Sequence, residues 1–520
     1  MPLVLSSPAL CALPGDRSGD LSTRPTPGFL WASARPTPVA APRILAVCDP
    51  VRELLTLERG WLESNEAMEI LAGNRLAPGS EPCATAYGGH QFGSWAGQLG
   101  DGRAILLGTH RAGNGERFEL QLKGAGPTAY SRRADGRAVL RSSLREFVCS
   151  EAMHALGIPT TRALSLVLTG DDVVRDMLYD GHPGAEPGAI VCRVAPSFVR
   201  FGHFELQRAL GEVELLRRLA DVVIADAYPD LAQSLDGEEK YAAFFMEVAE
   251  RTARLVVSWM RVGFVHGVLN TDNMSILGVT IDYGPYGFVE DFDAGFTPNT
   301  TDRGTRRYGF GAQPLVASWN IERLAVALAP LFSSEKPLQE GIDAFARAHD
   351  EAARKMLAAK LGFDENQGEA DDALARDLFG VLARCELDMT IFFRRLVDLD
   401  PHAPSADVVL SAVYREEAFA SHRGDLEAWL GRYAARICGN RTSPDVRRQT
   451  MRGANPRIVF RNYLAQEAID EVVQEGTSVK LEALMTALAR PYDDAPDGFD
   501  ARRPEWARTR VGCSMLSCSS

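Results

Sequence analysis

The sequence has no long apolar run, no export signal pattern and no paired-cysteine motif. No predominantly apolar segment approaches the roughly 18 residues that a membrane-spanning helix needs. The amino-terminal residues show no basic region followed by an apolar one, so we expect no secretory signal. The nine cysteines are scattered without a CxxC motif or a Cys/His metal spacing, so we expect most of them to be small buried residues. These absences predict a soluble protein.

An excess of basic charge is also absent. The chain carries 56 Lys and Arg residues against 69 Asp and Glu residues, a formal net charge of −13. This balance argues against a nucleic-acid partner or an anionic membrane surface, since both require basic patches. A local basic pocket for phosphate is still compatible with it. The 520 residues, 46% apolar and 24% charged, predict a globular protein of more than one lobe.

Polar and acidic side chains gather in one short stretch, residues 263–287. It contains a polar loop led by His266, a short apolar run and an acidic turn at Asp282. Asn273 and Asp282 are nine positions apart, and a hairpin between them would bring both side-chain oxygens together at its open end. Mg²⁺ on a nucleotide needs such an arrangement, with one or two protein oxygens and the remainder from phosphate and water.

The same stretch departs from protein kinases at one position. Kinases hold their metal with a catalytic-loop Asn and the Asp of a DFG motif. Here Asp282-Tyr283-Gly284 stands in place of DFG, and His266-Gly267-Val268 stands in place of HRD. Val268 thereby occupies the position of the kinase catalytic Asp. The sequence keeps the metal-binding pair and lacks the usual base.

A glycine-rich run precedes a lysine that ends a predicted strand. Gly100 and Gly102 lie before predicted strands at 104–107 and 118–123, and Lys123 closes the second of these. Glycines between strands suit a loop whose backbone amides approach phosphate closely, although glycine clusters often mark only turns. The phosphate-binding lysine of kinases has the same relation to its strand, which favours the nucleotide interpretation.

A helix is predicted from Ser142 or Ser143 to Leu156. Glu146 lies on it, one turn from the start, and two interpretations are open. Glu146 can form the ion pair that holds Lys123, as in kinases. Alternatively, Ser143 and Glu146 can form a capping box at the helix start. The upstream lysine favours the ion pair.

Two arginines flank the segment after a predicted strand at 189–194. Arg193 and Arg200 would grip phosphate oxygens if a nucleotide lay near them. The alternative is that they are structural or solvated charges. The next predicted helices cover residues 205–224 and 241–262, and the second of them leads into the His266 loop.

The order of the predicted elements resembles that of a protein kinase. We therefore predict an α+β, protein-kinase-like two-lobed fold with an additional helical part at the C-terminus. The expected divisions are an extended strap at 1–45, a β-rich lobe at 46–200, a helical lobe at 201–490 with further helices from 319 onward, and a tail at 491–520.

Three long motifs resemble those of the selenoprotein O (SelO, YdiU) family. They are YGGHQFGSWAGQLGDGRA at 87–104, the run from LQLKGAGPTAY to GIPTTRAL at 120–164, and GFVHGVLNTDNMSILGVTIDYGPYGF at 263–288. The resemblance extends over nearly the whole chain. It implies a kinase-like fold that transfers AMP from ATP to hydroxyl side chains of proteins, with ATP bound in the opposite sense to kinases.

The resemblance also implies roles for single residues. ATP contacts are implied at Gly100, Gly102, Arg103, Lys123, Asp135, Gly136, Arg193, Arg200 and Asp282. Asn273 and Asp282 would hold Mg²⁺, with Mn²⁺ as an alternative, Asp272 would accept the proton, and Glu146 would pair with Lys123. The implied partners are ATP and proteins that present Ser, Thr or Tyr hydroxyls, with no nucleic acid and no membrane. The compartment would be the cytoplasm of a bacterium, or the mitochondrion or another organelle of a eukaryote.

Two other functions stay open at this stage. One is a kinase that uses an unusual base, and the other is an ATP-binding pseudokinase that serves as a scaffold. Lys123, Glu146, Asp272, Asn273 and Asp282 together favour catalysis, because a pure binding protein does not need a metal pair and a base.

The last two cysteines, Cys513 and Cys518, lie on a polar tail that we expect to be exposed and open to redox exchange, unless it is a frayed end with idle thiols. Many bacterial family members carry a cysteine in the loop after DYG, thought to pair with the C-terminal cysteine. Residues 296–302 contain none, which argues against that disulfide and leaves Cys513 as the nearer candidate partner of Cys518.

Overall fold

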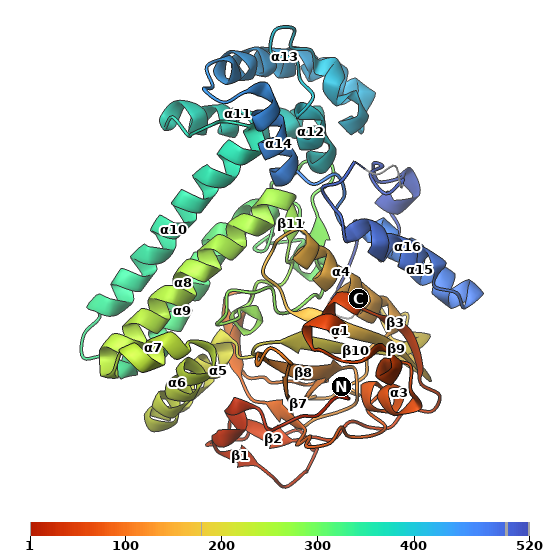
Figure 1. Cartoon of the computed structure of the whole chain (residues 1–520), viewed down its shortest axis with the longest axis vertical. Coiled ribbons are helices and arrows are strands. Elements are labelled where there is room, and N and C mark those ends of the chain that lie inside the picture. Colours follow the sequence, from red (N-terminus) through yellow and green to blue (C-terminus); the bar gives the residue numbers. More distant parts are fainter. Residues whose placement is uncertain (1, 178, 495–497, 518–520) are drawn as a thin grey trace.

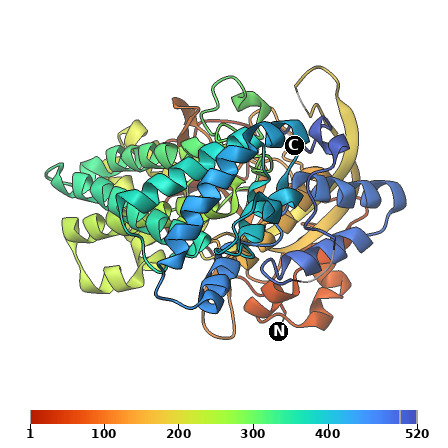
Figure 2. The same cartoon turned by 90° about the horizontal axis from the view of Figure 1, so that it is seen from above.

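The computed structural model describes residues 2–177, 179–494 and 498–517. Its N-terminal part is rich in strands and its C-terminal part is almost entirely helical (Figure 1). Seen from above, the long green helices occupy one side of the molecule and the yellow strands the other (Figure 2). The predicted α+β order of lobes is confirmed.

An eight-stranded sheet forms the first lobe. Its strands pair in the order β1-β2-β4-β7-β8-β10-β9-β3, antiparallel except for β1 and β2. In that order the bounds are Gly15–Asp16, Trp31–Ser33, Cys83–Thr85, Ala104–Arg111, Arg117–Lys123, Gly184–Ala195, Arg162–Arg175 and Arg43–Val47. The strands predicted at 104–107, 118–123 and 189–194 are all present. Each extends beyond its predicted bounds, because cross-strand pairing continues where the local pattern weakens.

The first 45 residues are built into this sheet. They supply the short helix η1 (Ala9–Ala12), β1, β2 and the start of β3. Trp31 on β2 is buried, and its indole N–H donates to the carbonyl of Leu13 at 3.0 Å. Leu3 and Leu5 are also buried in the core of this lobe. The N-terminal segment therefore contributes both strands and apolar side chains to the lobe that it covers.

Helix α4 (Leu140–Ala155) packs against β9 and β10. It begins before Ser142, and its N-cap, Val139, makes no side-chain capping bond. Ser143 therefore lies inside the helix, where its hydroxyl donates to the carbonyl of Ala189 at 3.4 Å. The capping-box interpretation is wrong, because the sheet has paired Val139 with Gly188 and fixes the start of the helix there.

The single helix predicted for residues 205–224 is two helices. They are α5 (Phe201–Leu210) and α6 (Val213–Ala227). Gly211 separates them with a φ of 75°, a left-handed conformation that glycine adopts readily and that ends a helix. Helix α5 contacts residues 88–91 and residues 271–273 of the polar loop.

Three long helices form the base of the second lobe: α8 (Gly237–Val262), α9 (Gln313–Leu328) and α10 (Lys336–Leu361). They lie side by side in Figure 1 and contact one another. Helix α8 ends at Gly263, whose φ of 75° turns the chain into the polar loop. The helix predicted for 241–262 therefore delivers the chain to the expected place.

Helices α11 to α14 form a second core, and α15 and α16 return to the first lobe. Trp429 and Tyr433 stack with ring centroids 5.1 Å apart in the second core, whereas α15 and α16 pack back against α4 (Figure 1). Within the described residues no helix is long and apolar enough to cross a membrane. The other helices are α1 (Asp49–Leu54), α2 (Arg59–Leu62), α3 (Asn65–Leu71), α7 (Pro229–Ser234), α11 (Glu369–Cys385), α12 (Met389–Leu396), α13 (Glu416–Cys438), α14 (Pro444–Ala454), α15 (Asn462–Glu475) and α16 (Val479–Leu488).

Candidate active site

Lys123 joins the two lobes at the end of β8. Its ammonium nitrogen lies 2.5 Å from Glu146 Oε2 on α4 and 2.5 Å from Asp282 Oδ1 on the acidic turn. Lys123 and Glu146 are both buried. The ion-pair interpretation of Glu146 is confirmed in its geometry, and the lysine also reaches the aspartate of the DYG motif.

Asp282 is held in its charged form. Burial by itself would raise the pKa of this carboxyl, but the charges of Lys123, Arg193 and Arg200 outweigh burial and hold the pKa well below its usual range. Oδ1 accepts from Lys123 and, at 3.2 Å, from the backbone N–H of Tyr283. Oδ2 accepts no hydrogen bond from any residue that the structure describes. One charged oxygen is thus available to a cation.

Asn273 is oriented by its amide nitrogen. Nδ2 donates to the carbonyl of Val268 at 2.9 Å, which turns Oδ1 the other way, toward Arg200 at 3.2 Å. An antiparallel bridge between Met274 and Thr280 closes the turn that connects Asn273 to Asp282. An amide oxygen and a free carboxylate oxygen match the hard ligands that Mg²⁺ prefers, so the residues present fit the implied metal.

Asp272 is a buried carboxyl whose side chain accepts one hydrogen bond from the residues that the structure describes. Its side chain accepts at Oδ2 from Gln91 Nε2 at 3.3 Å, while Oδ1 is buried without a hydrogen-bond partner among the described residues. Burial raises the pKa of Asp272 to about 6, although Arg200 opposes the shift. A carboxylate with a pKa near neutrality is suited to take a proton.

His266, unlike Asp272, is not placed to accept a proton at neutral pH. Its backbone N–H donates to Gln313 Oε1 at 2.9 Å, and burial lowers the pKa of its imidazole to about 4. The ring packs against Trp259 at 5.6 Å. His266 is therefore neutral and held in the core of the lobe, where it supports the loop.

Two buried arginines border this group. Arg193 donates through Nη1 to Gln121 at 2.7 Å and through Nη2 to the carbonyl of Ile281, and its Nε lies 3.0 Å from Glu146. Arg200 donates to the carbonyl of Asp272 at 2.8 Å. Arg193 therefore fixes the positions of Glu146 and the acidic turn, and Arg200 lies beside the carboxyl and amide of the polar loop.

The predicted glycines allow two loops to pack together. Gly100 has a φ of 142°, and a Cβ there would lie 2.5 Å from the Tyr130 ring. A Cβ on Gly102 would lie 2.8 Å from the Tyr130 carbonyl oxygen, and a Cβ on Gly136 would lie 2.1 Å from the Gly126 carbonyl oxygen. Larger residues at Gly100 or Gly102 would separate the 100–103 loop from the 124–137 loop, and a larger residue at Gly136 would distort the second loop itself.

Arg103 and Asp135 lie on these two loops. Among the described residues, the Arg103 side chain has no hydrogen bond or ion pair, so it is available to an anion. Asp135 is half exposed and pairs with Arg175 at 2.6 Å on β9. The structure thus brings Lys123, Arg193 and Arg200 together with Asp272, Asn273 and Asp282. The Asp135 carboxylate instead pairs with Arg175.

A hairpin covers the polar loop, and the sequence analysis missed it. It consists of β5 (Gly88–Gln91) and β6 (Ser94–Gln98). His90 N–H donates to Thr271 Oγ1 at 2.7 Å, and Gln91 reaches Asp272. The available signal was the Phe92-Gly93 turn, since a two-residue loop with positive φ at both positions, here 51° and 85°, is typical of tight hairpins.

The tail returns to the loop that follows DYG. Leu516 N–H donates to the Pro298 carbonyl at 3.1 Å, and Thr300 N–H donates to the Leu516 carbonyl at 2.8 Å. The expectation of an exposed tail is wrong for Cys513, which is buried, and burial raises the pKa of its thiol to about 11. Cys518 lies outside the described residues. Backbone hydrogen bonds therefore connect the tail at Leu516 to the loop at Pro298 and Thr300. This loop has no cysteine that could form a disulfide with the tail.

The fold is a protein-kinase-like two-lobed fold. Strand β8 supplies Lys123, helix α4 supplies Glu146, and the helical lobe supplies the loop with Asp282. Val268 stands in place of the usual base. A family model described as "Protein adenylyltransferase SelO" matches residues 30–489. The chain therefore belongs to the SelO family of protein adenylyltransferases, and it is an enzyme of AMP transfer.

Similar bacterial proteins cover the whole length. The chain is 59% identical over 492 residues to a protein nucleotidyltransferase YdiU of Xanthomonas campestris pv. campestris (strain B100), covering 94% of each chain. It is 55% identical to the YdiU protein of Aromatoleum aromaticum, covering 100% of this chain and 99% of that one. Among solved structures it is similar to ROP2 from Toxoplasma gondii, described as a virulence factor with a protein-kinase fold and no enzymatic activity, at 13% identity, a TM-score of 0.21, and coverage of 67% of this chain and 87% of ROP2.

Proposed function

We propose that this enzyme transfers AMP from ATP to Ser, Thr or Tyr hydroxyls of other proteins and releases diphosphate. The observation that carries the proposal is the meeting of Lys123 with both Glu146 and Asp282 at 2.5 Å, next to a polar loop whose HRD position holds Val268. A base placed for transfer of the terminal phosphate is missing, while the groups that neutralise phosphate charge are present.

Asn273 and Asp282 would hold Mg²⁺, or Mn²⁺ in its place, on the phosphates of the nucleotide. When bound, the ion would neutralise charge on the phosphoryl group that is transferred. Lys123 and Arg200 would add positive charge on the protein side, and Arg103 would offer a free guanidinium. In the inverted orientation of ATP, these groups would favour departure of diphosphate from the α-phosphorus.

Asp272 would act as the proton acceptor. As the oxygen of an acceptor hydroxyl forms its bond to the α-phosphorus, the bond from that phosphorus to the diphosphate oxygen breaks, and the hydroxyl proton passes to Asp272. The carboxylate has a free oxygen, Oδ1, for this proton. Its burial keeps the carboxylate poorly hydrated, which strengthens it as a base.

Position-specific labels test the proposal. The protein is incubated with Mg²⁺ and ATP that carries ³²P at either the α- or the γ-phosphate, with β-casein as the acceptor protein. Label that stays on protein from the α position only, and that is lost in Asp282→Ala, is the expected result. Label from the γ position would show phosphorylation, and label from neither would show a nucleotide-binding protein without transfer.

A further inference from the structure

A buried arginine lies one residue before the glutamate that pairs with Lys123. Arg145 on α4 is 1% exposed. It donates through Nη1 to Asn462 Oδ1 at 2.7 Å and through Nη2 to the carbonyl of Tyr286 at 2.9 Å. No carboxylate pairs with it in the described part of the chain. A buried guanidinium that has only neutral acceptors depends on each of them, because an unsatisfied charge in the core is costly.

Tyr286 connects this arginine to the metal-binding turn. Its hydroxyl donates back to the Arg145 carbonyl at 2.9 Å, and its ring centroid lies 4.4 Å from the guanidinium carbon. Tyr286 comes four residues after Asp282 in the sequence. Arg145 thus holds α4 against the segment that follows the DYG motif.

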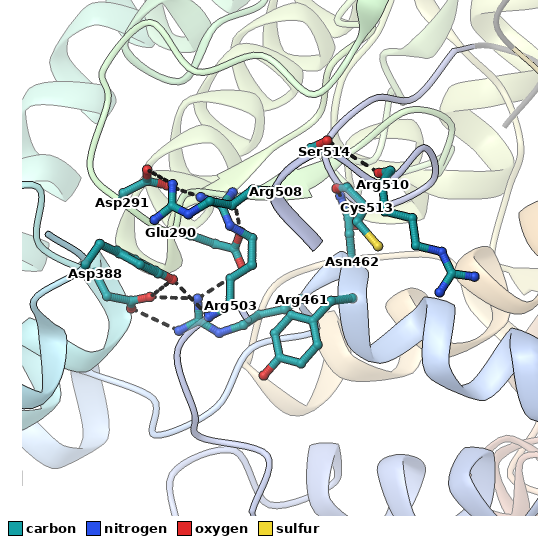
Figure 3. A network of polar contacts seen from close by, with 12 residues as sticks. Glu290, Asp291, Asp388, Arg461, Asn462, Arg503, Arg508, Arg510, Cys513 and Ser514 are labelled. Atoms are coloured by element: carbon teal, nitrogen blue, oxygen red, sulfur yellow. Dashed lines mark hydrogen bonds and ion pairs between the residues drawn. The ribbon is translucent and has the colours of Figure 1, made fainter. Parts of the chain in front are cut away.

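Asn462, the first residue of α15, connects the same arginine to the C-terminal helices. Its Nδ2 donates to the carbonyl of Cys513 at 3.0 Å. This bond fixes the direction of the amide, since a reversed amide would place a donor against the donors of Arg145. Figure 3 shows Asn462 next to Cys513 of the tail. Helices α15 and α16 both contact α4, so Asn462 lies at the interface between α4 and these two C-terminal helices.

A network of ion pairs anchors the tail that orients Asn462. Arg503 lies 2.9 Å from Glu290 and 2.7 Å from Asp291, and Arg508 lies 3.2 Å from Asp291 (Figure 3). Arg503 and Arg508 lie ten and five residues before Cys513, which is itself buried. The carbonyl of Cys513 is therefore a fixed acceptor and not part of a loose end.

We propose that Asn462 is a positioning residue for AMP transfer, which acts through Arg145 to hold α4 where Glu146 contacts Lys123. The inference rests on the proposed function of the Lys123 site. Without Oδ1 of Asn462, the Arg145 guanidinium must move toward water to recover a partner. Because Glu146 is its neighbour on the same helix, that movement shifts Glu146 away from Lys123. The C-terminal helices thus complete the active site without touching it.

Matched variants separate this role from a general effect on stability. Asn462→Ala removes the acceptor, whereas Asn462→Asp keeps an acceptor oxygen for Arg145 and loses the donor to Cys513. Asn440→Ala is the control, since Asn440 also bridges an arginine, Arg436 at 2.9 Å, and a backbone carbonyl, Gly362 at 2.7 Å. That bridge lies in the C-terminal helical part, and within the described residues neither Arg436 nor Gly362 forms a hydrogen bond or ion pair with α4.

Two readouts are measured on the full chain: kcat for transfer from α-labelled ATP to β-casein at saturating MgATP, and amide hydrogen exchange of residues 140–155. Asn462→Ala is expected to lower kcat at least 10-fold and to speed exchange in α4 at least 10-fold. Asn462→Asp should stay within 3-fold of the wild type and Asn440→Ala within 2-fold in both. Either readout of Asn462→Ala within 2-fold of the wild type, or an Asp variant as defective as the Ala variant, would overturn the proposal.

A second background shows whether Asn462 acts through Arg145. Arg145→Met removes the buried charge and with it the need for an acceptor, so adding Asn462→Ala to it should change kcat by less than 2-fold. An additional loss as large as in the wild-type background would refute the coupling. The wild type itself tests the proposed function, which fails if no α-label is transferred to protein. Lys123→Ala tests the site: normal AMP transfer by this variant would refute the assignment of the reaction to Lys123. An inactive Lys123→Ala beside a normal Asn462→Ala refutes only the positioning role.

Discussion

Asp272 is buried, and among the described residues its side chain accepts one long hydrogen bond and keeps one oxygen without a partner, which suits it to accept a proton. Gln91 approaches one oxygen at 3.3 Å and leaves the other without a partner. Asn273, its neighbour in sequence, is instead fixed by Val268 and Arg200. Adjacent residues of one loop are thus suited to different tasks, one to take a proton and the other to hold a cation.

Asp272→Asn should lower kcat for AMP transfer by about 10²- to 10⁴-fold, the range that is typical for loss of a general base. The amide has almost the same shape, so binding of a non-hydrolysable ATP analogue with Mg²⁺ should change by less than about 3-fold. Initial rates with α-labelled ATP and titration calorimetry measure the two effects. A variant that keeps full kcat would exclude Asp272 as the base.

Glu119 on β8 is a buried acid whose charge opposes folding. Its Oε2 accepts from the Phe198 N–H at 2.9 Å, but burial raises its pKa from 4.5 to about 8. The folded state therefore binds more protons than the unfolded state between these values. By linkage, this residue makes stability fall as the pH rises, by up to about 1.4 kcal/mol per pH unit between about 4.5 and about 8.

Glu119→Gln should remove this contribution to the pH dependence. The amide oxygen can still accept from Phe198, and the variant should be more stable than the wild type at pH 8. Urea unfolding at pH 5, 6.5 and 8 gives the free energies to compare. The exposed Glu116→Gln is the control and should leave the pH trend unchanged. If the stability of Glu119→Gln falls between pH 5 and 8 as steeply as that of the wild type, the carboxyl is not the cause.

At the scale of elements, the β5–β6 hairpin is the feature that sequence reasoning treated only as a glycine-rich run. Its contacts with the polar loop join residues about 180 positions apart, for example 181 for Gln91 and Asp272. No local pattern encodes such a separation. Helix α8 was easier to predict, because it follows from the spacing of its own apolar residues.

Gly89→Ala tests how closely the hairpin lies on Asp272. The φ of Gly89 is not in the left-handed region, so the effect is steric: a Cβ would lie 2.8 Å from Asp272 Oδ1 and 2.9 Å from its Cβ. We expect kcat to fall about 10- to 100-fold, since a displacement near 1 Å at the reacting groups has this effect. Gly431→Ala, on α13 with open space around it, is the control. Unchanged kcat in Gly89→Ala would show that the hairpin moves away freely.

At the scale of the whole molecule, buried ion pairs connect the C-terminal part to the rest. Arg461 donates to both oxygens of Asp388 at 2.8 and 2.9 Å, and both residues are buried. Figure 3 shows this pair next to the arginines of the tail. Such a pair adds less than its geometry suggests, because desolvation opposes it, but loss of one partner leaves a charge in the core.

Arg461→Ala should lower the free energy of unfolding by about 3–5 kcal/mol, the usual cost of an uncompensated buried charge. Guanidinium unfolding followed by tryptophan fluorescence measures it. Arg441→Ala removes an exposed ion pair with Glu365 and should cost no more than about 1 kcal/mol. Equal effects of the two variants would mean that the network around Asp388 does not stabilise the fold.

The residues of the site were largely predictable because they belong to short motifs. Lys123 ends a strand, and Asn273 and Asp282 flank one tight turn, so their chemistry follows from neighbours in the sequence. The break at Gly211 was missed because apolar spacing continues across it. The capping box at Ser143 was wrong because pairing of Val139 with the sheet, a tertiary contact, decides where α4 begins.

The sequence by itself determined the family and the order of lobes, and it predicts phosphate and metal chemistry, since motifs and periodicity are local properties. Only the tertiary structure decided what covers Asp272, what anchors the tail and what holds α4 in place. Arg145 and Asn462 are 317 positions apart, and their contact exists only because the C-terminal helices fold back on α4. A buried charge must find its acceptors wherever the packed chain supplies them, and spacing along the sequence does not reveal that place.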